Sequence, residues 1–381
     1  MIRSFDAVVL GAGIVGAACA MELAEAGMRV AVVEPGVAGG GATAAGMGHI
    51  VAMDDSPAQL ALTLYGQELW QQWAAQLPAG AEHESAGTLW VARNPAEAAE
   101  ALRKQKILHA QGVRSQWLDA DQLQREEPNL RRNLAGGLLV SSDAVLYPPV
   151  AARFFLECAC THGATLLCDR AIAAAQGTVT LSSGETLTAP HTLHALGADA
   201  TRLIPELPIK KRKGHLAITD RAPGFLRHQL IELSYTQSAG SGTADSVAFN
   251  VQPRKTGQIL IGSSRQYNAE TTEIDRGILS SMLERTLTFL PAIEQLSILR
   301  VWTGFRAATP DKLPLIGPLP TDPTQILATG HEGLGITTSL ATAKLVSGLL
   351  TRTESPISLD PYLPARLLSE SRCAQTEQAH G

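Results

Sequence analysis

The sequence predicts an α/β fold in which a Rossmann-type parallel-sheet domain is interleaved with an α+β domain built on a mixed or antiparallel sheet. The first observation is the length of 381 residues, which is too long for one compact core. The second is a strand, a glycine-rich turn, a helix and another strand at the N-terminus. The third is residues 214–264, where short β-rich runs follow one another. Together they predict a parallel sheet early in the chain and a largely antiparallel one later.

The N-terminal unit is predicted from its hydrophobic pattern. A β-rich run at 5–10 precedes an alanine-rich helical stretch at 14–26, which ends at Gly27. A second apolar run follows at 29–33. This order is typical of a βαβ unit with two parallel strands.

The turn between the first strand and the helix has the glycine spacing of a dinucleotide site. Gly11 permits a tight turn, Gly13 lets the backbone approach a pyrophosphate, and Gly16 permits close packing of helix on sheet. Ile14 and Val15 open the helix, and the N–H groups and dipole there favour phosphate. We expect all five residues to contact a dinucleotide.

An acidic residue ends the second strand. Glu34 lies 18 residues after Gly16, where a carboxylate can bind ribose hydroxyls. An acid at this place argues against the 2′-phosphate of NADP, which leaves FAD or NAD. Pro35, beside it, belongs to the predicted cofactor contacts.

A second glycine-rich stretch at 36–48 favours FAD. A simple NAD dehydrogenase usually proceeds to its next helix here, whereas an extended flavin needs backbone close to its pyrophosphate and ring. The Thr43 hydroxyl is expected to bind phosphate. The other predicted contacts in this stretch are Ala42, Gly46, Met47 and Gly48.

The remaining elements are predicted from hydrophobic periodicity and from the positions of glycine and proline residues. Helices are predicted at 58–77, 95–111, 150–162, 275–290 and 335–351. Strands are predicted at 87–92, 165–167, 178–182, 192–196, 216–219, 246–251, 258–262, 299–304 and 326–329. The pattern is looser at 118–149, and a proline-rich turn is predicted at 310–323.

These elements predict a discontinuous division of the chain. A nucleotide-binding domain takes residues 1–85, 145–213 and 300–365, and a substrate-binding domain takes 86–144 and 214–299. Residues 366–381 are expected to form a flexible tail.

Composition excludes several functional classes. The net charge, 31 basic minus 36 acidic residues, is −5, which gives no field for nucleic acid or anionic membrane. The basic run at 210–213 is interpreted as a solvated strand end. The five cysteines have no metal-site spacing, so no metal is expected. No secretory signal or transmembrane stretch is predicted, and we expect a bacterial-type cytoplasmic protein that is able to form oligomers.

Four ordered motifs resemble those of glycine oxidases and other D-amino-acid-oxidase-type flavoenzymes, and they extend over almost the whole chain. They are GATAAGM at 41–47, HALGAD at 194–199, WTGFRAATPDKLPLIG at 302–317 and TGHEGLGI at 329–336. The resemblance implies a GR2-like FAD-binding domain and oxidation of a C–N bond by hydride transfer to flavin N5. Two departures are Leu196, where a small residue is usual, and Ala307 in place of proline.

The resemblance also implies site residues. Arg306 occupies the position that holds the substrate carboxylate, which a planar guanidinium binds with two hydrogen bonds. A structural alternative is that Arg306 holds the turn at 310–320. Further predicted cofactor contacts are Gly197, Arg306, Gly330, Gly333, Leu334, Gly335 and Ile336. The segment 333–336 would stabilise negative charge on the flavin, or serve only as helix entry.

Two histidines lie beside the flavin-loop glycines. His49 and His331 are candidate bases or covalent flavin anchors, although a loop histidine more often makes only a hydrogen bond. His49 has the alternative of lining the substrate pocket, with Met47 as an apolar wall. We take Arg306, His49 and Met47 as the candidate catalytic set. The run at 248–254 has no tyrosine, which argues against glycine as the substrate.

The segment LIGSSRQY at 260–267 resembles D-hydroxyproline dehydrogenases and the flavin subunits of hydrogen-cyanide synthase. The leading hypothesis is therefore an FAD-dependent dehydrogenase of a D-amino or cyclic imino acid such as D-hydroxyproline or D-proline. Its electrons would pass to partner subunits with iron–sulphur clusters or to another acceptor. One alternative is a glycine- or sarcosine-type oxidase that reduces O2 to H2O2. Another is a non-catalytic, flavin-holding assembly subunit.

Overall fold

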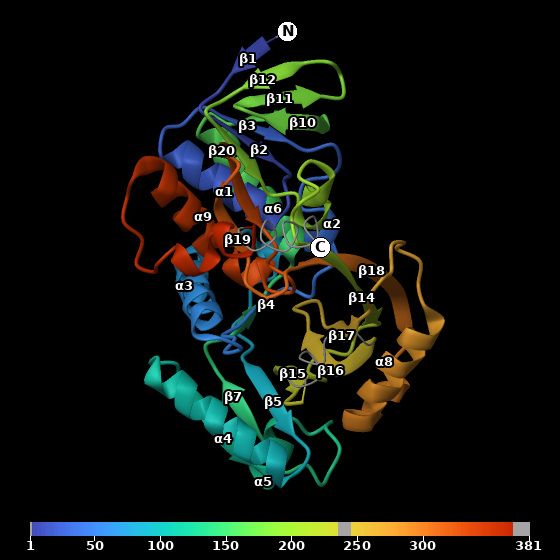
Figure 1. Ribbon diagram of the computed structural model, residues 1–381. Coiled ribbons are helices and arrows are strands. Elements are labelled where there is room, and N and C mark those ends of the chain that lie inside the picture. The colour runs from blue at the N-terminus through green and yellow to red at the C-terminus, as the bar shows by residue number, and fades with distance from the viewer. Residues whose placement is uncertain (1, 235–244, 369–381) are drawn as a thin grey trace, which may run out of the picture.

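The computed structural model describes residues 2–234 and 245–368. Within these residues the strands form a six-stranded sheet, an eight-stranded sheet, a four-stranded sheet and a two-stranded pair. Figure 1 shows the six-stranded sheet and its helices in the upper half of the molecule and most of the eight-stranded sheet in the lower half.

The six-stranded sheet contains the N-terminal βαβ unit. Its order is β19 (Leu315–Leu319), β20 (Asp322–Thr329), β13 (His191–His194), β2 (Ala7–Leu10), β3 (Val30–Val33) and β9 (Thr165–Leu167). All neighbours pair in parallel except β19 and β20. Because β2 and β3 are buried at every position, they have the continuous apolar pattern of a sheet covered on both faces. The predicted βαβ unit is confirmed.

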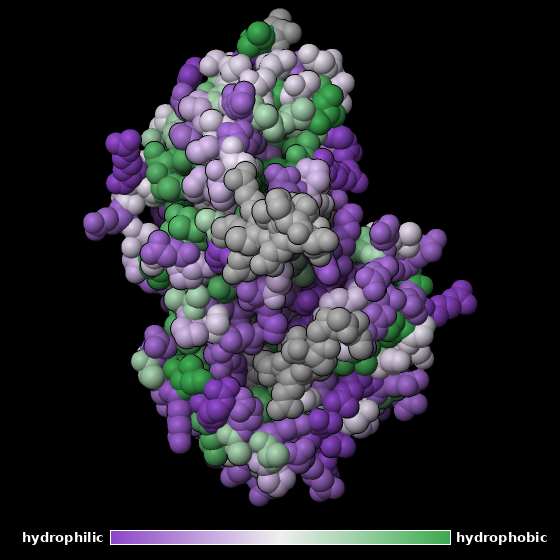
Figure 2. Space-filling view, viewed as in Figure 1, coloured by the Kyte–Doolittle hydropathy of each residue, from purple (hydrophilic) through white to green (hydrophobic). Residues whose placement is uncertain are grey.

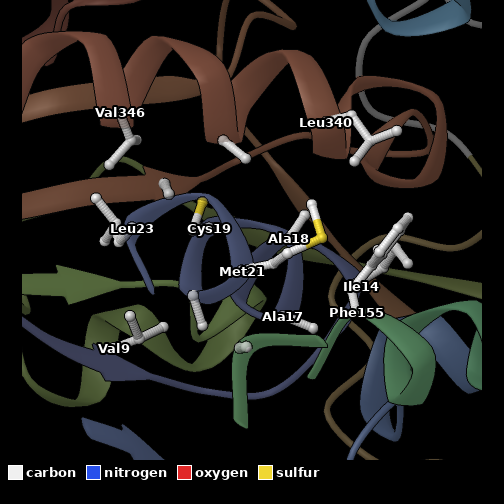
Figure 3. Packing of buried hydrophobic residues seen from close by; sticks show 14 of the residues in the cluster. Val9, Ile14, Ala17, Ala18, Cys19, Met21, Leu23, Phe155, Leu340 and Val346 are labelled. Atoms are coloured by element: carbon white, nitrogen blue, oxygen red, sulfur yellow. The ribbon is translucent and has the colours of Figure 1, made fainter. Parts of the chain in front are cut away.

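Four helices form the layer beside this sheet, and two of the four pack mainly on the other helices. They are α1 (Ile14–Glu25), α3 (Pro57–Trp73), α6 (Pro148–Thr161) and α9 (Gly335–Thr351). The small side chains of α1 let α6 and α9 approach closely on either side. Figure 3 shows the resulting core, with Val9, Ile14, Ala17, Ala18, Cys19, Met21, Leu23, Phe155, Leu340 and Val346.

A four-stranded sheet covers the other side of β2 and β3. Its order is β1 (Ile2–Ser4), β12 (Thr186–Thr188), β11 (Thr178–Leu181) and β10 (Ala171–Ala175). Val179, Leu181 and Leu187 pack against Val8 and Leu10 of the central strand. The two core layers hold the C-terminal end of β2 rigidly, which is where the dinucleotide turn begins.

The eight-stranded sheet is mostly antiparallel. Its order is β18 (Ile298–Ala308), β14 (Lys210–Thr219), β17 (Ile259–Arg265), β16 (Ser246–Pro253), β15 (Gln229–Glu232), β5 (Thr88–Ala92), β7 (Gly136–Val140) and β6 (Ser115–Asp119). Three helices adjoin it: α4 (Pro95–Ala110), α5 (Ala120–Glu126) and α8 (Arg276–Phe289). Phe249 and Phe289 stack with ring centroids 4.5 Å apart and join α8 to the sheet.

Short elements complete the described chain. The pair β4 (His49–Ile50) and β8 (Ala144–Val145) is antiparallel. The short helices are α2 (Gly41–Ala44), α10 (Ala365–Leu368), η1 (Ala79–Ala81), η2 (Gly197–Arg202), η3 (Pro291–Gln295) and η4 (Asp360–Tyr362). α2 lies against β18, so the glycine-rich loop meets the eight-stranded sheet.

Two predictions of local structure were wrong, and a third was right only in part. The loose region at 118–149 contains α5, β7 and β8. The proline-rich turn at 310–323 contains β19. The basic run at 210–213 is a strand end as predicted, because it begins β14 with Lys210 exposed, but the run is solvated only in part, since it pairs with β18 and Lys213 is only 4% exposed. The helix α5 begins with a local capping box at Asp119, whereas the strands depend on pairing. β7 pairs with β5 and β6, β8 with β4, and β19 with the adjacent β20.

The predicted two-domain division stays a proposal. The strands β14 and β18 cross its boundaries at 213/214 and 299/300. Of the predicted tail, residues 366–368 belong to α10, and residues 369–381 lie outside the described part of the chain.

In the described residues no helix has both the length and the apolar character needed to cross a membrane. On the face shown in Figure 2, hydrophilic residues dominate and hydrophobic residues occur in small separate groups.

Candidate active site

The turn after β2 is built from glycines that other residues cannot replace without strain. Gly11 has φ +98°, and a Cβ there would lie 2.8 Å from the carbonyl oxygen of Ala195. A Cβ on Gly16 would lie 2.0 Å from the carbonyl oxygen of Gly11. The first turn of α1 therefore lies directly on the end of β2, as the spacing predicts.

Thr43 joins the glycine-rich loop to the N-terminus of α1. Gly13, the N-cap residue, has no side chain to cap the helix, and the buried Thr43 Oγ1 accepts a 3.0 Å hydrogen bond from Ile14 N. Because a hydroxyl is both acceptor and donor, Thr43 retains its O–H for a phosphate. The N–H of Val15 lies in the same first turn.

Glu34 lies beside the same turn. Its Oε2 accepts a hydrogen bond from Ala12 N at 2.9 Å, and its Oε1 accepts one from Gly36 N at 2.8 Å. Each carboxylate oxygen keeps a second acceptor position for a ribose hydroxyl. The neighbouring Pro35 is exposed and makes the rim of this site.

The glycine-rich loop continues to the eight-stranded sheet. Gly48 has φ +106°, and a Cβ there would lie 1.9 Å from Leu146 O. Met47 Sδ lies against Gly262 of β17, where a Cβ would be only 3.0 Å from the sulphur. Gly46 contacts the side chain of Ile336. Ala42, in α2, is exposed.

Arg306 projects from β18 between two glycine backbones. A Cβ on Gly214 would lie 2.8 Å from Arg306 Nη1, and a Cβ on Gly333 would lie 3.7 Å from its Cδ. Nη1 donates a 2.9 Å hydrogen bond to the Ser264 carbonyl oxygen. The proline-rich turn is held instead by Arg366, which binds Asp311 and the Leu313 carbonyl oxygen.

His49 lies close enough to Arg306 for the charge of the guanidinium to affect the pKa of the His49 ring. Burial and the positive charge of Arg306 lower the pKa of His49 to about 3, so its ring is neutral at physiological pH. Its Nε2 is buried and has no hydrogen-bond partner among the described residues. Thr337 Oγ1 donates a 2.9 Å hydrogen bond to the His49 carbonyl oxygen, which ties this residue to α9.

His331 has a different environment. Its Nε2 lies 2.9 Å from Thr342 Oγ1, and burial lowers its pKa to about 4. The ring thus fastens the loop before α9 to the helix itself. This hydrogen bond occupies one of the two ring nitrogens that a covalent anchor or a base would use.

The loop at 330–335 is shaped by Gly330, which has φ +80°. Thr329 Oγ1 donates a 2.9 Å hydrogen bond to Gly197 O, bringing two of the predicted motifs together. The helix α9 begins at Gly335, and its N-cap residue Leu334 provides no side-chain cap. The first N–H groups of α9 therefore suit an anionic group.

A cavity of about 280 Å³ lies where the glycine-rich loop faces the eight-stranded sheet. Ala44, Gly46 and Met47 line its loop side, and Leu260 and Trp302 are among its sheet residues. Arg306 and His49 do not line it. Of the candidate catalytic set, Met47 alone lines this cavity.

The comparisons agree with this geometry. The model of the DAO family, described as FAD dependent oxidoreductase, matches residues 6–349. The chain belongs to this family. It is FAD-dependent, and its fold is the mixed α/β fold of the family.

Several relatives cover nearly the whole chain. Hydrogen cyanide synthase subunit HcnC of Pseudomonas aeruginosa is 27% identical over 429 residues, covering 97% of this chain and 98% of that protein. Glycine oxidase of Geobacillus kaustophilus is 28% identical over 378 residues, covering 95% and 97%. A crystal structure of glycine oxidase from Geobacillus kaustophilus has a TM-score of 0.86 at 26% identity, covering 96% and 99%. The structure of L-proline dehydrogenase from P. horikoshii has a TM-score of 0.86 at 23% identity and shows the same fold.

The residues of this DAO-family chain fit FAD. Gly11 and Gly16 leave no room for a Cβ, the N-terminus of α1 lacks its own side-chain cap, and Glu34 lies beside this turn. These groups would hold the pyrophosphate and ribose, and the first turn of α9 would face the flavin.

Sequence reasoning missed two site-proximal residues in this oxidoreductase. Arg212 lies in the basic run and Glu332 lies within the TGHEGLGI motif, and the sequence alone singles out neither. The two form an ion pair. The one signal in the sequence is that Arg212 belongs to a basic run next to a predicted strand. Its partner Glu332 lies 120 residues away, so the sequence does not show that the two meet.

Proposed function

We propose that this chain is the FAD-dependent dehydrogenase of a D-amino or cyclic imino acid such as D-hydroxyproline or D-proline. The observation that supports it most is Arg306, whose guanidinium lies between Gly214 and Gly333 close to the loop that opens α9. An arginine fixed in this way suits the carboxylate of a small amino acid.

Arg306 would fix the substrate by its carboxylate. A guanidinium binds two carboxylate oxygens in parallel, so one residue sets both position and orientation. The hydrogen bond from Arg306 Nη1 to the Ser264 carbonyl oxygen fixes one edge of the guanidinium. Fixing the carboxylate places the adjacent carbon–nitrogen bond at a set distance from the flavin, which is the main requirement of this chemistry.

His49 would accept a hydrogen bond from the substrate amine. Its ring is neutral because its pKa is lowered to about 3, so it adds no positive charge beside an ammonium or iminium group. Its buried Nε2 has no partner among the described residues, which is the state expected of an atom that binds a ligand. Met47 would form an apolar wall next to it.

Bound FAD supplies the hydride acceptor. The N–H groups at the start of α9 would face the negative charge that reduction creates, because their dipole is directed there. The protein's remaining task is to exclude water, and the apolar side chains of Met47, Leu216 and Leu260 pack together for this.

The proposal also includes an electron acceptor for the reduced flavin. The relative named as a subunit of hydrogen cyanide synthase supports an electron-accepting partner subunit, for which an iron–sulphur protein is our candidate. We also propose a cytoplasmic location, with which the unpaired thiols of the described cysteines agree.

A second candidate is an oxidase of the glycine or sarcosine type. The relative from Geobacillus kaustophilus is named glycine oxidase and matches 95% of this chain, which favours this alternative. The two candidates differ in the electron acceptor. The dehydrogenase would pass its electrons to a partner subunit, whereas the oxidase would pass them to oxygen.

An anaerobic substrate panel tests the proposal. The FAD-loaded protein is mixed with D- and L-amino acids, sarcosine, and the proline and hydroxyproline isomers, and the visible flavin bands are followed. We expect bleaching by D-cyclic imino acids, with slow recovery in air. Fast recovery with H2O2 would favour the oxidase, and no bleaching by any amine would refute both.

A further inference from the structure

Two arginines face each other beside the candidate active site. Arg212 on β14 and Arg306 on β18 are direct cross-strand partners, so their side chains project from the same face of the sheet. Like charges directly opposite one another destabilise an antiparallel pair. A nearby negative charge is therefore expected.

Glu332 supplies that charge to Arg212. Arg212 Nη1 donates a hydrogen bond to Glu332 Oε1, and the side chains are only 11% and 14% exposed. The Arg212 guanidinium carbon also lies 4.9 Å from the centroid of Tyr267, which covers one face of the cation. A shielded, hydrogen-bonded ion pair of this kind is stronger than an exposed one.

The same loop touches both arginines. Glu332 N donates a 2.9 Å hydrogen bond to Ala307 O, the carbonyl next to Arg306. The following residue, Gly333, lies against the Arg306 side chain. Arg212 Nε is buried without a hydrogen-bond partner among the described residues, so Glu332 does not use the whole fork. The loop thus separates a neutralised arginine from the proposed substrate-binding one.

We propose that Glu332 is a specificity-determining residue that limits the site to substrates with a single carboxylate. Its own carboxylate occupies Arg212, so that only Arg306 is left to bind the carboxylate of the substrate. A second carboxylate on the substrate would meet the negative charge of Glu332 in place of an available guanidinium. This inference rests on the proposed function, because it assumes that Arg306 binds the substrate carboxylate.

Binding of simple carboxylates to the FAD-loaded full-length protein tests this directly. Butanoate and succinate have similar lengths but one and two carboxylates, and each is titrated while the visible flavin spectrum is followed. The wild type should bind butanoate more tightly. Glu332→Gln keeps the shape and removes the charge, and it should shift the preference toward succinate by about tenfold, the effect of one charge-assisted hydrogen bond.

The chain offers a matched control. Glu82 pairs with Arg254 at 2.5 Å with both side chains 15% exposed, and Arg254 lies 4.5 Å from the Tyr147 ring centroid. This Arg–Glu–Tyr cluster resembles that of Arg212, but its Arg254 and Tyr147 line the cavity of about 280 Å³, which Arg306 does not line. Glu82→Gln should leave the butanoate-to-succinate ratio unchanged. Adding Arg212→Met to Glu332→Gln should abolish the gain for succinate.

Three results would overturn the inference: equal changes for both ligands in Glu332→Gln, a shift in Glu82→Gln instead, or no preference in the wild type. If Glu332→Gln does not fold, the wild-type comparison is still able to overturn the inference, because the inference requires tighter binding of butanoate. Amino-acid bleaching is measured separately. Bleaching without carboxylate discrimination would refute only the role of Glu332, whereas failure of every amine to bleach the flavin would refute the proposed function.

Discussion

The Thr43 hydroxyl accepts a 3.0 Å hydrogen bond from Ile14 N and so connects two segments 29 residues apart. Thr43→Val keeps the shape and removes both this bond and the proposed phosphate bond. We expect FAD to bind about tenfold more weakly, as the loss of one charge-assisted hydrogen bond implies. Quenching of flavin fluorescence on binding measures the change. Thr43→Ser should retain most of the affinity, and equal weakening by both substitutions would argue against a role for the hydroxyl.

Close packing of α1 on β2 predicts that Gly16→Ala is destabilising. Its Cβ would lie 2.0 Å from Gly11 O, so the helix must shift. We expect a loss of about 1–3 kcal/mol in the free energy of unfolding, as is usual for overpacking, together with weaker FAD binding. Urea denaturation of the FAD-free protein measures the first effect. Gly80→Ala is the control, because its Cβ would lie 3.7 Å from Val150 Cγ1, an ordinary contact distance, and should cost little.

The Lys104–Asp54 ion pair predicts a large stability effect. The two side chains are 4% and 6% exposed, and the Lys104 ammonium lies 4.4 Å from the Trp90 ring centroid. Lys104→Met leaves the Asp54 carboxylate buried without its cation, which typically costs about 3–5 kcal/mol. Thermal and urea unfolding measure the loss. Adding Asp54→Leu should recover much of it, and additive losses would show that the pair is not coupled.

The lowered pKa of His331 predicts how its contribution to stability depends on pH. Its folded pKa is about 4 and its ordinary value 6.5, so between these values the unfolded state binds more protons and stability falls as the pH falls. His331→Asn does not titrate and loses this dependence. The stability advantage of the wild type over His331→Asn should shrink by about 2 kcal/mol from pH 7 to pH 5. A difference that does not change with pH would contradict a buried, neutral His331.

Local sequence was sufficient for the first βαβ unit. Gly11, Gly13 and Gly16 belong to one turn, and their spacing expresses contacts within a few residues of each other. The helix predicted at 335–351 matches α9 because its apolar positions and starting glycine are also local. The family motifs predicted the FAD-binding fold for the same reason, since each is a continuous segment.

Pairing between distant segments could not be predicted. The strand at 210–213 depends on β18, which begins 88 residues after Lys210, and its charges alone favoured a solvated end. The position of Arg306 between Gly214 and Gly333 combines three segments, and the Arg212–Glu332 pair combines two. Hydrophobic periodicity and secondary-structure propensity are local properties of the sequence. They do not show which charged residues come into contact when these lie far apart in the chain.

The most direct test compares anaerobic flavin reduction by D-proline and by pyrrolidine, the same ring without the carboxylate. We expect D-proline to reduce the wild type, with a second-order rate constant at least about 100-fold above that for pyrrolidine, as two charge-assisted hydrogen bonds imply. Arg306→Leu should remove this advantage and leave the slow reaction with pyrrolidine unchanged. Equal rates for the two compounds in the wild type, or an equal loss for both in Arg306→Leu, would contradict carboxylate binding by Arg306.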